Sequence, residues 1–213
     1  MNEVSDHPFL QLIRQRCSVE SFDTAREVPE STVRALVADA SCAPSSFNIQ
    51  HWRFVAVRSR AGREKLLDAA FGQEQVIQAP VTFIVLGDLQ GTERLPRIMR
   101  AAVEQDAIVQ GKADAWIRMA GQIYADASMA RDEAIRSASL ASMILMLAAE
   151  ARGLASGALS GFSVEKVRQQ FNIAERYLPV VLLTVGYPRE QSEGRMPRLD
   201  IDEILVFESG ADL

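Results

Sequence analysis

Apolar residues recur every three or four positions in several stretches of the chain, which is the pattern of amphipathic helices. In the first stretch, Phe9, Leu12 and Ile13 form a single apolar stripe. Pro44 disfavours helical geometry for the residue before it and so ends the second stretch. The pattern predicts helices over Pro8–Arg16, Pro29–Cys42, Arg63–Phe71, Asp132–Arg152 and Ser163–Phe171.

The helix predicted over Asp132–Arg152 differs from the others because its apolar residues cover most of the circumference. Such a helix is typical of a protein interior, so we expect it to run through the core and to end at Gly153. The preceding segment, Leu95–Met129, has helical propensity but mixed polarity. We expect residues 95–129 to form a variable helical cover over a pocket.

Three shorter stretches predict strands. Val81–Leu86 and Val180–Val185 are almost continuously apolar, as expected of strands covered on both faces. Trp52–Val57 is rich in aromatic and β-branched residues. Helices and strands do not alternate strictly and no GxGxxG follows a strand, which argues against a Rossmann domain. We predict an α+β fold with a central mixed or antiparallel sheet packed between helices.

The length of 213 residues suits one core and is short for two full-sized domains, so we predict a single domain over 1–213. Near the end the chain turns polar over 188–197 and then becomes apolar again over Ile201–Phe207. Residues that leave the body and regain apolar character often contact another subunit. We therefore expect 188–213 to be a C-terminal arm.

Composition limits the classes of function. The 23 basic and 28 acidic residues give a net charge of −5, which favours neither nucleic acid nor an anionic membrane as a partner. Cys17 and Cys42 form no CxxC pair, which suits a reducing compartment, and two histidines are too few for a His-rich metal centre. The N-terminus is polar and lacks an apolar signal core. We expect a cytoplasmic protein.

Two basic segments could bind a phosphate. Arg16 and Ser18 stand two residues apart after the first predicted helix, where the guanidinium and the hydroxyl can donate to one phosphate group. A cation that merely favours a helix C-terminus is the alternative. The late segment Arg195–Asp200 adds Arg195 and Arg198, and a solvated basic turn is the alternative there.

Two further segments could contact a ligand. Ala43–Phe54 is dense in hydrogen-bonding side chains at a helix–strand junction, where α/β proteins often place ligand contacts. The alternative is a polar turn in which Ser and Asn cap their own backbone. Within it, His51 suits a structural bond to a carbonyl better than catalysis. Small residues in Gly157–Phe162 would let the backbone approach a ring, although an ordinary Gly-rich loop would look the same.

The order and spacing of these segments resemble the nitroreductase family of flavoproteins. An Arg-x-Ser turn is followed by Ala-Pro-Ser-Ser-x-Asn-x-Gln-x-Trp-x-Phe over Ala43–Phe54. The Asn-x-Gln-His-Trp form of this run is similar to that of a small bacterial NAD(P)H-dependent subgroup. The resemblance covers Ile13 to Leu205 and continues through Ser139–Ala149, Gly153, Gly161–Phe162 and Leu178–Tyr187.

The resemblance implies a nitroreductase-like fold in an intertwined homodimer, with FMN bound at the subunit interface. It implies that the turn from Arg16 through Cys17 to Ser18 holds the phosphate and that a late arginine completes the contact, either Arg195 or Arg198. The loop of the other subunit would reach the flavin through Pro44, Ser45, Ser46 and Asn48. Backbone beneath the flavin N5 and O4 would come from Leu159, Ser160 and Gly161.

Two positions depart from the family pattern. Glu20 stands where the family usually has a lysine or arginine that donates to the flavin, and a carboxylate there would lower the redox potential. Gly72 stands where many relatives have an asparagine that contacts the pyrimidine ring, and Gln75 is a plausible substitute donor. Both departures bear on how the protein would handle FMN.

The resemblance further implies ping-pong hydride transfer. NADH or NADPH would reduce FMN, and a small-molecule electron acceptor such as a nitroaromatic, a quinone or an enone would then take its place. Because the cofactor carries this chemistry, no catalytic side chain and no metal is required. The alternatives are another FMN enzyme of the same fold, such as a dehalogenase or a flavin-fragmenting enzyme, and a non-catalytic dimeric flavin-binding module.

Overall fold

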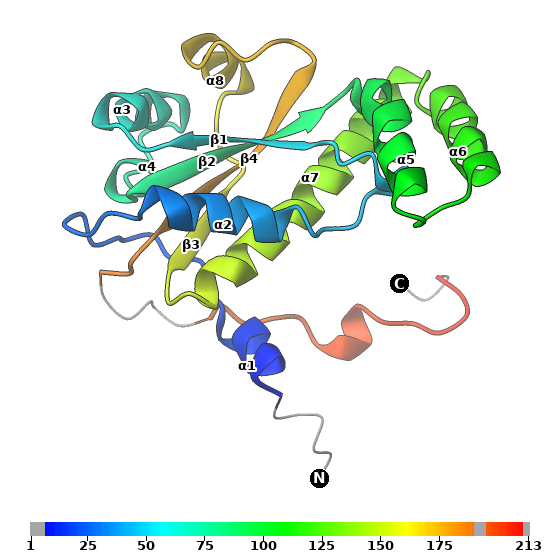
Figure 1. Ribbon diagram of the computed structural model, residues 1–213. Coiled ribbons are helices and arrows are strands. Elements are labelled where there is room, and N and C mark those ends of the chain that lie inside the picture. The colour runs from blue at the N-terminus through cyan, green and yellow to red at the C-terminus, as the bar shows by residue number, and fades with distance from the viewer. Residues whose placement is uncertain (1–6, 190–194, 211–213) are drawn as a thin grey trace.

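The centre of the computed structural model, which describes residues 7–189 and 195–210, is a four-stranded antiparallel sheet (Figure 1). Residue Trp52 of the first strand lies opposite Gly87, and Ala155 of the third lies opposite Gly186. Of the two sheet types predicted, the antiparallel one is therefore confirmed. In spatial order the strands are β1 (Trp52–Val57), β2 (Val81–Asp88), β4 (Tyr177–Gly186) and β3 (Ala155–Leu159).

Strand β2 is buried over its whole length because both faces of the sheet are covered. Val81, Phe83 and Val85 point into one hydrophobic cluster, whereas Ile84 and Leu86 point into the other. This alternation follows from the two-residue period of a strand. The sheet therefore separates two apolar layers, as expected from the continuous apolar run.

Helices cover both faces of the sheet (Figure 1). The first cluster receives Leu36 from α2 and Leu145 from α7, and the second receives Leu66 from α3 and Val167 from α8. Every predicted helix exists, with ends shifted by up to five residues, and the short α4 was not predicted. The bounds are α1 (Pro8–Gln15), α2 (Glu30–Ala40), α3 (Arg60–Ala69), α4 (Gln75–Gln78), α7 (Ala127–Glu150) and α8 (Val164–Gln170).

Helix α7 begins earlier than predicted because Asp126 caps it. The Asp126 carboxylate accepts hydrogen bonds from the backbone N–H groups of Ser128 and Met129. One face of α7 packs on the sheet, as expected, but Leu140 and Met143 are exposed to 42% and 38%. The expectation that α7 runs through the core is thus correct for one face only, and its other apolar face is uncovered in the single chain.

Most of the segment 95–129 forms a separate helical lobe beside one end of the sheet, and its last three residues begin α7 (Figure 1). It contains α5 (Leu95–Glu104) and α6 (Gln110–Ile123), preceded by a 3-10 turn over Gly91–Arg94. Leu95, Met99, Ala113 and Ala120 form its own small core together with Ile49. The segment is therefore helical, as its propensity predicted, and it contains two helices.

The prediction of a Gly-rich loop over Gly157–Phe162 is wrong for the first three of these residues, because they lie in strand β3. Its small side chains allow a second segment to lie against it. A Cβ atom at Gly157 would stand 2.7 Å from the carbonyl oxygen of Val19 and 2.8 Å from the hydroxyl of Thr184. Glycine is therefore required where the turn after α1 meets the sheet.

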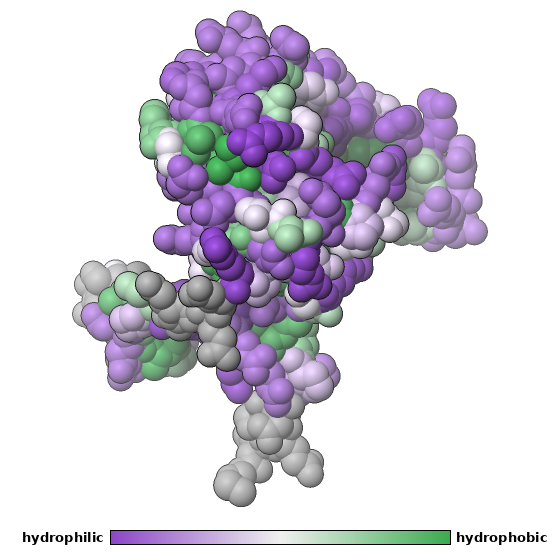
Figure 2. All heavy atoms as spheres, turned by 90° about the vertical axis from the view of Figure 1, so that its left-hand side faces the viewer, coloured by the Kyte–Doolittle hydropathy of each residue, from purple (hydrophilic) through white to green (hydrophobic). Residues whose placement is uncertain are grey.

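The C-terminal residues 195–210 leave the body, with only a short 3-10 turn at Ile201–Glu203 (Figure 1). Their apolar side chains are exposed, including Met196 at 75% and Phe207 at 79%. Figure 2 shows a mostly hydrophilic face on which hydrophobic side chains gather in patches, some of them on the projecting lower part. No helix among the residues the structure describes is long and apolar enough to span a membrane.

Candidate functional site

The turn that follows α1 is fastened to the edge of the sheet. The backbone N–H of Val19 donates to the carbonyl of Ser156 over 3.0 Å, and Ser18 forms an isolated parallel bridge with the same residue. Ser18 and Glu20 flank the buried Val19 and are exposed. The Nη1 atom of Arg195 donates to the carbonyl of Arg14 over 3.0 Å. The turn around Arg16 and the late basic segment Arg195–Asp200 are therefore neighbours.

Arg16 carries an unused donor in this turn. The residue is half-buried, and its Nη1 atom is buried without a hydrogen-bond partner among the described residues. Its charge acts on Glu150, at the end of α7, where burial raises the pKa of the carboxyl group and Arg16 opposes that rise. A buried guanidinium nitrogen with no partner is costly unless a ligand accepts from it. The residues present therefore fit an anionic group.

The end of β3 lies in the same region. Leu159 is buried, whereas Ser160 and Gly161 are exposed directly after the strand. The side chain of Gln73 donates to the carbonyl of Gly161 over 2.7 Å and so ties the segment after Gly72 to this site. Gln75, the predicted substitute donor, is instead the first residue of α4 and makes no such bond among the described residues.

Gln73 was missed by sequence reasoning. The signal that could have found it is the neighbouring Gly72, whose φ of +79° turns the chain directly before Gln73. Such a turn re-aims the side chains that follow it, so a polar residue next to an isolated glycine is a natural ligand or loop anchor.

The loop over 44–48 has an unusual backbone. Phe47, Asn48 and Gln50 have φ angles of 51°, 55° and 57°, in the left-handed region that non-glycine residues seldom occupy. The Ser45 hydroxyl accepts from the backbone N–H of Gln50 over 2.9 Å and helps to hold this conformation. Strained backbone maintained by specific contacts is concentrated at functional sites in proteins.

Glu133 of α7 anchors the loop and was also missed. It is 6% exposed, and it accepts from the backbone N–H of Ser46 over 3.4 Å and from the hydroxyl of Ser137 over 2.7 Å. The signal that could have found it is a single glutamate on the buried face of α7, where the other residues are mostly small or apolar. Phe47 packs edge-on against Trp116, which joins the loop to the lobe.

The two groups of predicted residues lie at opposite edges of the sheet. The turn around Arg16 and Ser18 borders β3, whereas Pro44, Ser45, Ser46 and Asn48 precede β1. Three strand spacings separate these edges, which is about 14 Å. The segments around Arg16, Gly157–Phe162 and Arg195 therefore form one group, and one chain does not bring the 44–48 loop to them.

His51 is held as a structural residue. Its Nδ1 atom lies 2.8 Å from the carbonyl oxygen of Asp88, and its ring packs edge-on against Tyr124. Burial lowers the pKa of His51 below its usual value, so the ring is neutral at neutral pH. A Cβ atom at Gly91 would stand 2.6 Å from the same ring nitrogen, which explains the glycine.

A second polar centre surrounds Asp88 at the end of β2. The carboxylate is fully buried and lies 2.5 Å from Arg94 and 3.1 Å from Arg176. Burial alone would raise the pKa of Asp88, but hydrogen bonds from Arg94 and from the backbone of Gln90 hold it below its usual value. Asp88 is therefore an anion at neutral pH that orders the surrounding arginines.

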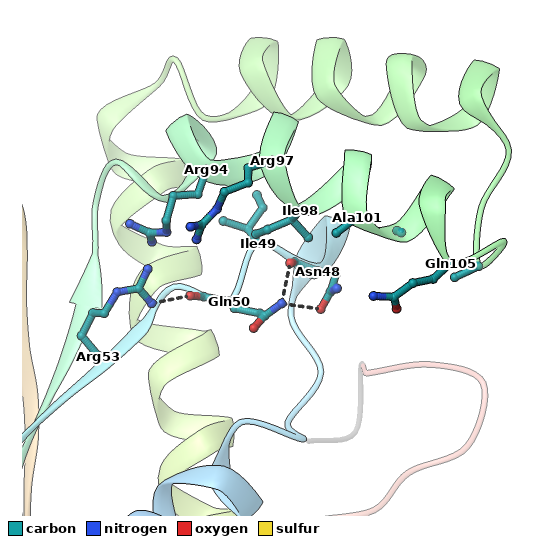
Figure 3. Close-up of a pocket in the computed structure, with 11 residues that line it drawn as sticks. Asn48, Ile49, Gln50, Arg53, Arg94, Arg97, Ile98, Ala101 and Gln105 are labelled. Atoms are coloured by element: carbon teal, nitrogen blue, oxygen red, sulfur yellow. Dashed lines mark hydrogen bonds between the residues drawn. The ribbon is translucent and has the colours of Figure 1, made fainter.

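Beside this centre is a pocket of about 930 Å³ between the 48–50 segment and α5. The guanidinium groups of Arg53, Arg94 and Arg97 gather at one end, and Gln105 lies at the other (Figure 3). None of these arginines is among the predicted site residues, although Arg53 lies within the Ala43–Phe54 segment. Arg53 is far in the sequence from Arg94 and Arg97, and the fold brings it to them.

The fold and the family-specific segments define the class of this protein. The family model described as "Nitroreductase family" matches residues 13–187, and the chain belongs to that family. It is 34% identical over 191 residues to the Bacillus subtilis protein named "Putative NAD(P)H nitroreductase YodC", covering 88% of this chain and 94% of that protein.

Two further proteins match over most of their length. A Thermus thermophilus protein named "NADH dehydrogenase" is 34% identical over 185 residues, or 84% of this chain and 86% of the other. A solved structure from Exiguobacterium sibiricum, described as a "putative nitroreductase in complex with FMN", superposes with a TM-score of 0.88 at 29% identity. That superposition covers 95% of this chain and 98% of the other.

Proposed function

We propose that this protein is an FMN-dependent oxidoreductase that uses NADH or NADPH to reduce a small-molecule acceptor of the nitroaromatic, quinone or related class. The observation that carries the proposal is the buried Nη1 atom of Arg16, which has no partner in the described part of the chain, two residues before the exposed Ser18. It stands in a chain whose family includes FMN-bound and NAD(P)H-named relatives. FMN, when bound, supplies the chemistry by accepting a hydride and passing it on.

The phosphate of FMN would be held by Arg16 and Ser18. The guanidinium contributes a charge-assisted contact and the hydroxyl a neutral one. Between the two late arginines, Arg195 is the better third partner, because it already lies against the end of α1. Arg198 donates to the backbone carbonyls of Met196 and Pro197 within its own turn.

The end of β3 would support the flavin ring. Gly161 leaves this surface open, since a Cβ atom there would meet only the side-chain nitrogen of Gln73, at 3.5 Å. Gln73 in turn fixes the carbonyl of Gly161 and so sets the direction of the peptide between Gly161 and Phe162. These residues bind and orient, and no acid–base pair is needed for hydride transfer.

We propose further that the protein is a homodimer in which the 44–48 loop of one subunit completes the site of the other. The separation of the two groups across the sheet supports this arrangement, because one chain leaves the loop away from Arg16. The uncovered face of α7, including Leu140 and Met143, and the exposed apolar residues of the arm supply surfaces for such contact.

Mixing two inactive variants tests the shared site. Arg16→Ala removes the phosphate contact and Asn48→Ala removes a loop contact, so each homodimer should lose activity. A mixed dimer carries one site with both defects and one with neither, and we expect about half of the wild-type activity per dimer. Failure of subunit exchange to restore any activity, with exchange verified by native mass spectrometry, would place both residues in the same subunit's site.

The activity itself is tested on purified protein. We expect bound FMN and acceptor-dependent oxidation of NADH or NADPH with a nitroaromatic or a quinone. A yellow protein that oxidises neither nicotinamide would favour another FMN enzyme of this fold, and a colourless protein that does not take up FMN would favour a different role.

Cys17 and Cys42 are thiols in the structure, which agrees with the cytoplasmic location we propose.

A further inference from the structure

The pocket beside α5 has no task in the function proposed above. It is large enough for a small molecule of the size of an aromatic acid or part of a nucleotide. Its polar end contains Arg53, Arg94 and Arg97, whose guanidinium groups lie near one another in Figure 3. Its other end is formed by one side of α5, with Ile98, Ala101 and Gln105.

The positive charge at the polar end is only partly compensated. Asp88 is shared among Arg53, Arg94 and Arg176, at 4.0, 2.5 and 3.1 Å. A single carboxylate cannot neutralise three guanidinium groups, and among the described residues Glu93 pairs with Arg176 alone. The Nη2 atom of Arg94 is buried without a partner within the described part of the chain.

Arg97 is the most available of these cations. It is exposed, and within residues 7–189 and 195–210 its side chain has no hydrogen bond or ion pair. It stands in the first turn of α5, which contains no acidic residue. A cation near a helix N-terminus is unfavourable because the helix dipole is positive there. An anion bound between Arg97 and Arg94 would offset both the dipole and the excess charge.

We infer that this pocket binds the oxyanion group of a small molecule that has an apolar body, such as an aromatic carboxylate or a phosphate ester. The oxyanion would accept from Arg94 and Arg97, and the body would lie along Ile98 and Ala101. Asn48 and Gln50 line the pocket, and Asn48 belongs to the 44–48 loop that the dimer proposal places at the flavin. Resting on that proposal, the pocket selects anionic substrates for the same enzyme.

The charged group has two possible sources in such an enzyme, the electron acceptor and the 2′-phosphate of NADPH. Isothermal titration of the FMN-loaded protein with 4-nitrobenzoate and with the uncharged 4-nitrobenzamide tests the first. Steady-state KM values for NADPH and NADH with an uncharged quinone test the second. The variant is Arg97→Gln, and Arg100→Gln is the matched control, because Arg100 is exposed on the same helix and does not line the pocket.

We expect Arg97→Gln to weaken the charged ligand about tenfold, the lower end for a charge-assisted contact, and to leave the uncharged ligand unchanged. Arg100→Gln should change neither, and salt should weaken the charged ligand only. If Arg97→Gln weakens only 4-nitrobenzoate, the group bound is the carboxylate of an electron acceptor. If it raises only the KM for NADPH, the group bound is the 2′-phosphate of the nicotinamide cofactor. Equal behaviour of the two variants with all four ligands overturns the inference.

The titration also separates this inference from the proposed function. If the protein binds 4-nitrobenzoate in an Arg97-dependent manner but oxidises neither nicotinamide, the anion site is supported and the proposed oxidoreductase function is contradicted. If the protein turns over normally and Arg97→Gln and Arg100→Gln bind every ligand alike, the proposed oxidoreductase function is supported and the anion site is contradicted.

Discussion

Replacing Arg16 with alanine tests the phosphate contact on which the site depends. The side chain is half-buried and its Nη1 atom is buried, so the contact with a phosphate is shielded from water. A hydrogen bond to a charged group contributes about 1.5–3 kcal/mol. At about 1.4 kcal/mol for each factor of ten, Arg16→Ala should weaken FMN binding about tenfold to a hundredfold.

The assay compares FMN with riboflavin, which lacks the phosphate. Titration of the apoprotein, followed by quenching of flavin fluorescence, should show the loss for FMN and almost none for riboflavin. Arg34→Ala is the control, because it also removes one arginine, and the one ion pair of Arg34 among the described residues is an exposed one with Glu30. Equal weakening of both flavins by Arg16→Ala would refute the reasoning and make the residue structural.

The same geometry predicts whether replacing Glu150 strengthens or weakens FMN binding. This carboxylate interacts with Arg16 and would repel an incoming phosphate. Glu150→Gln should therefore strengthen FMN binding by a few-fold while riboflavin binding stays constant. Weaker FMN binding in this variant would show that Glu150 orients Arg16 rather than competing for it.

Three further predictions concern the redox potential, pH and assembly. In spectroelectrochemical titration, Glu20→Lys should raise the two-electron potential of bound FMN relative to wild type, and Glu20→Gln should lie between the two. Each 1.4 kcal/mol of electrostatic energy corresponds to on the order of 30 mV. Identical potentials in the three proteins would mean that the exposed Glu20 does not act on the flavin. Because the folded-state pKa of His51 is lowered, the unfolded chain binds more protons below about pH 6.5, and stability should fall there by at most about 1.4 kcal/mol per pH unit. Urea unfolding at several pH values should show a shallower fall for His51→Gln, and an equal fall in both proteins would contradict the assignment. Truncation after Pro188 should give an aggregating or monomeric product in sedimentation experiments, whereas a stable dimer would show that the arm is dispensable.

Much of the fold follows from local patterns in the sequence. The buried strands were predicted because Val81–Leu86 and Val180–Val185 are nearly continuous apolar runs, and the helices because their apolar stripes repeat at helical spacing. β3 was not, since Ala155–Leu159 is made of small residues with little strand propensity. It is a strand because it pairs with β4 and accepts the turn after α1.

The candidate site was only partly accessible from the sequence. The polar density of Ala43–Phe54 marked the loop, but its left-handed backbone was hidden because Phe47 and Gln50 are not glycines. Arg53 and Arg176 lie far from Asp88 along the chain, so no spacing rule could relate them to it. Tertiary structure alone creates that cluster and the pocket beside it.

Anaerobic stopped-flow reduction of the FMN-loaded dimer tests the central claim most directly. Mixing with NADH or NADPH in the absence of acceptor should bleach the flavin absorbance in one turnover, and adding a nitroaromatic or a quinone should restore it. This pair of half-reactions is what a ping-pong oxidoreductase predicts. Bound flavin that neither nicotinamide reduces, or reduced flavin that no such acceptor reoxidises, would contradict the account.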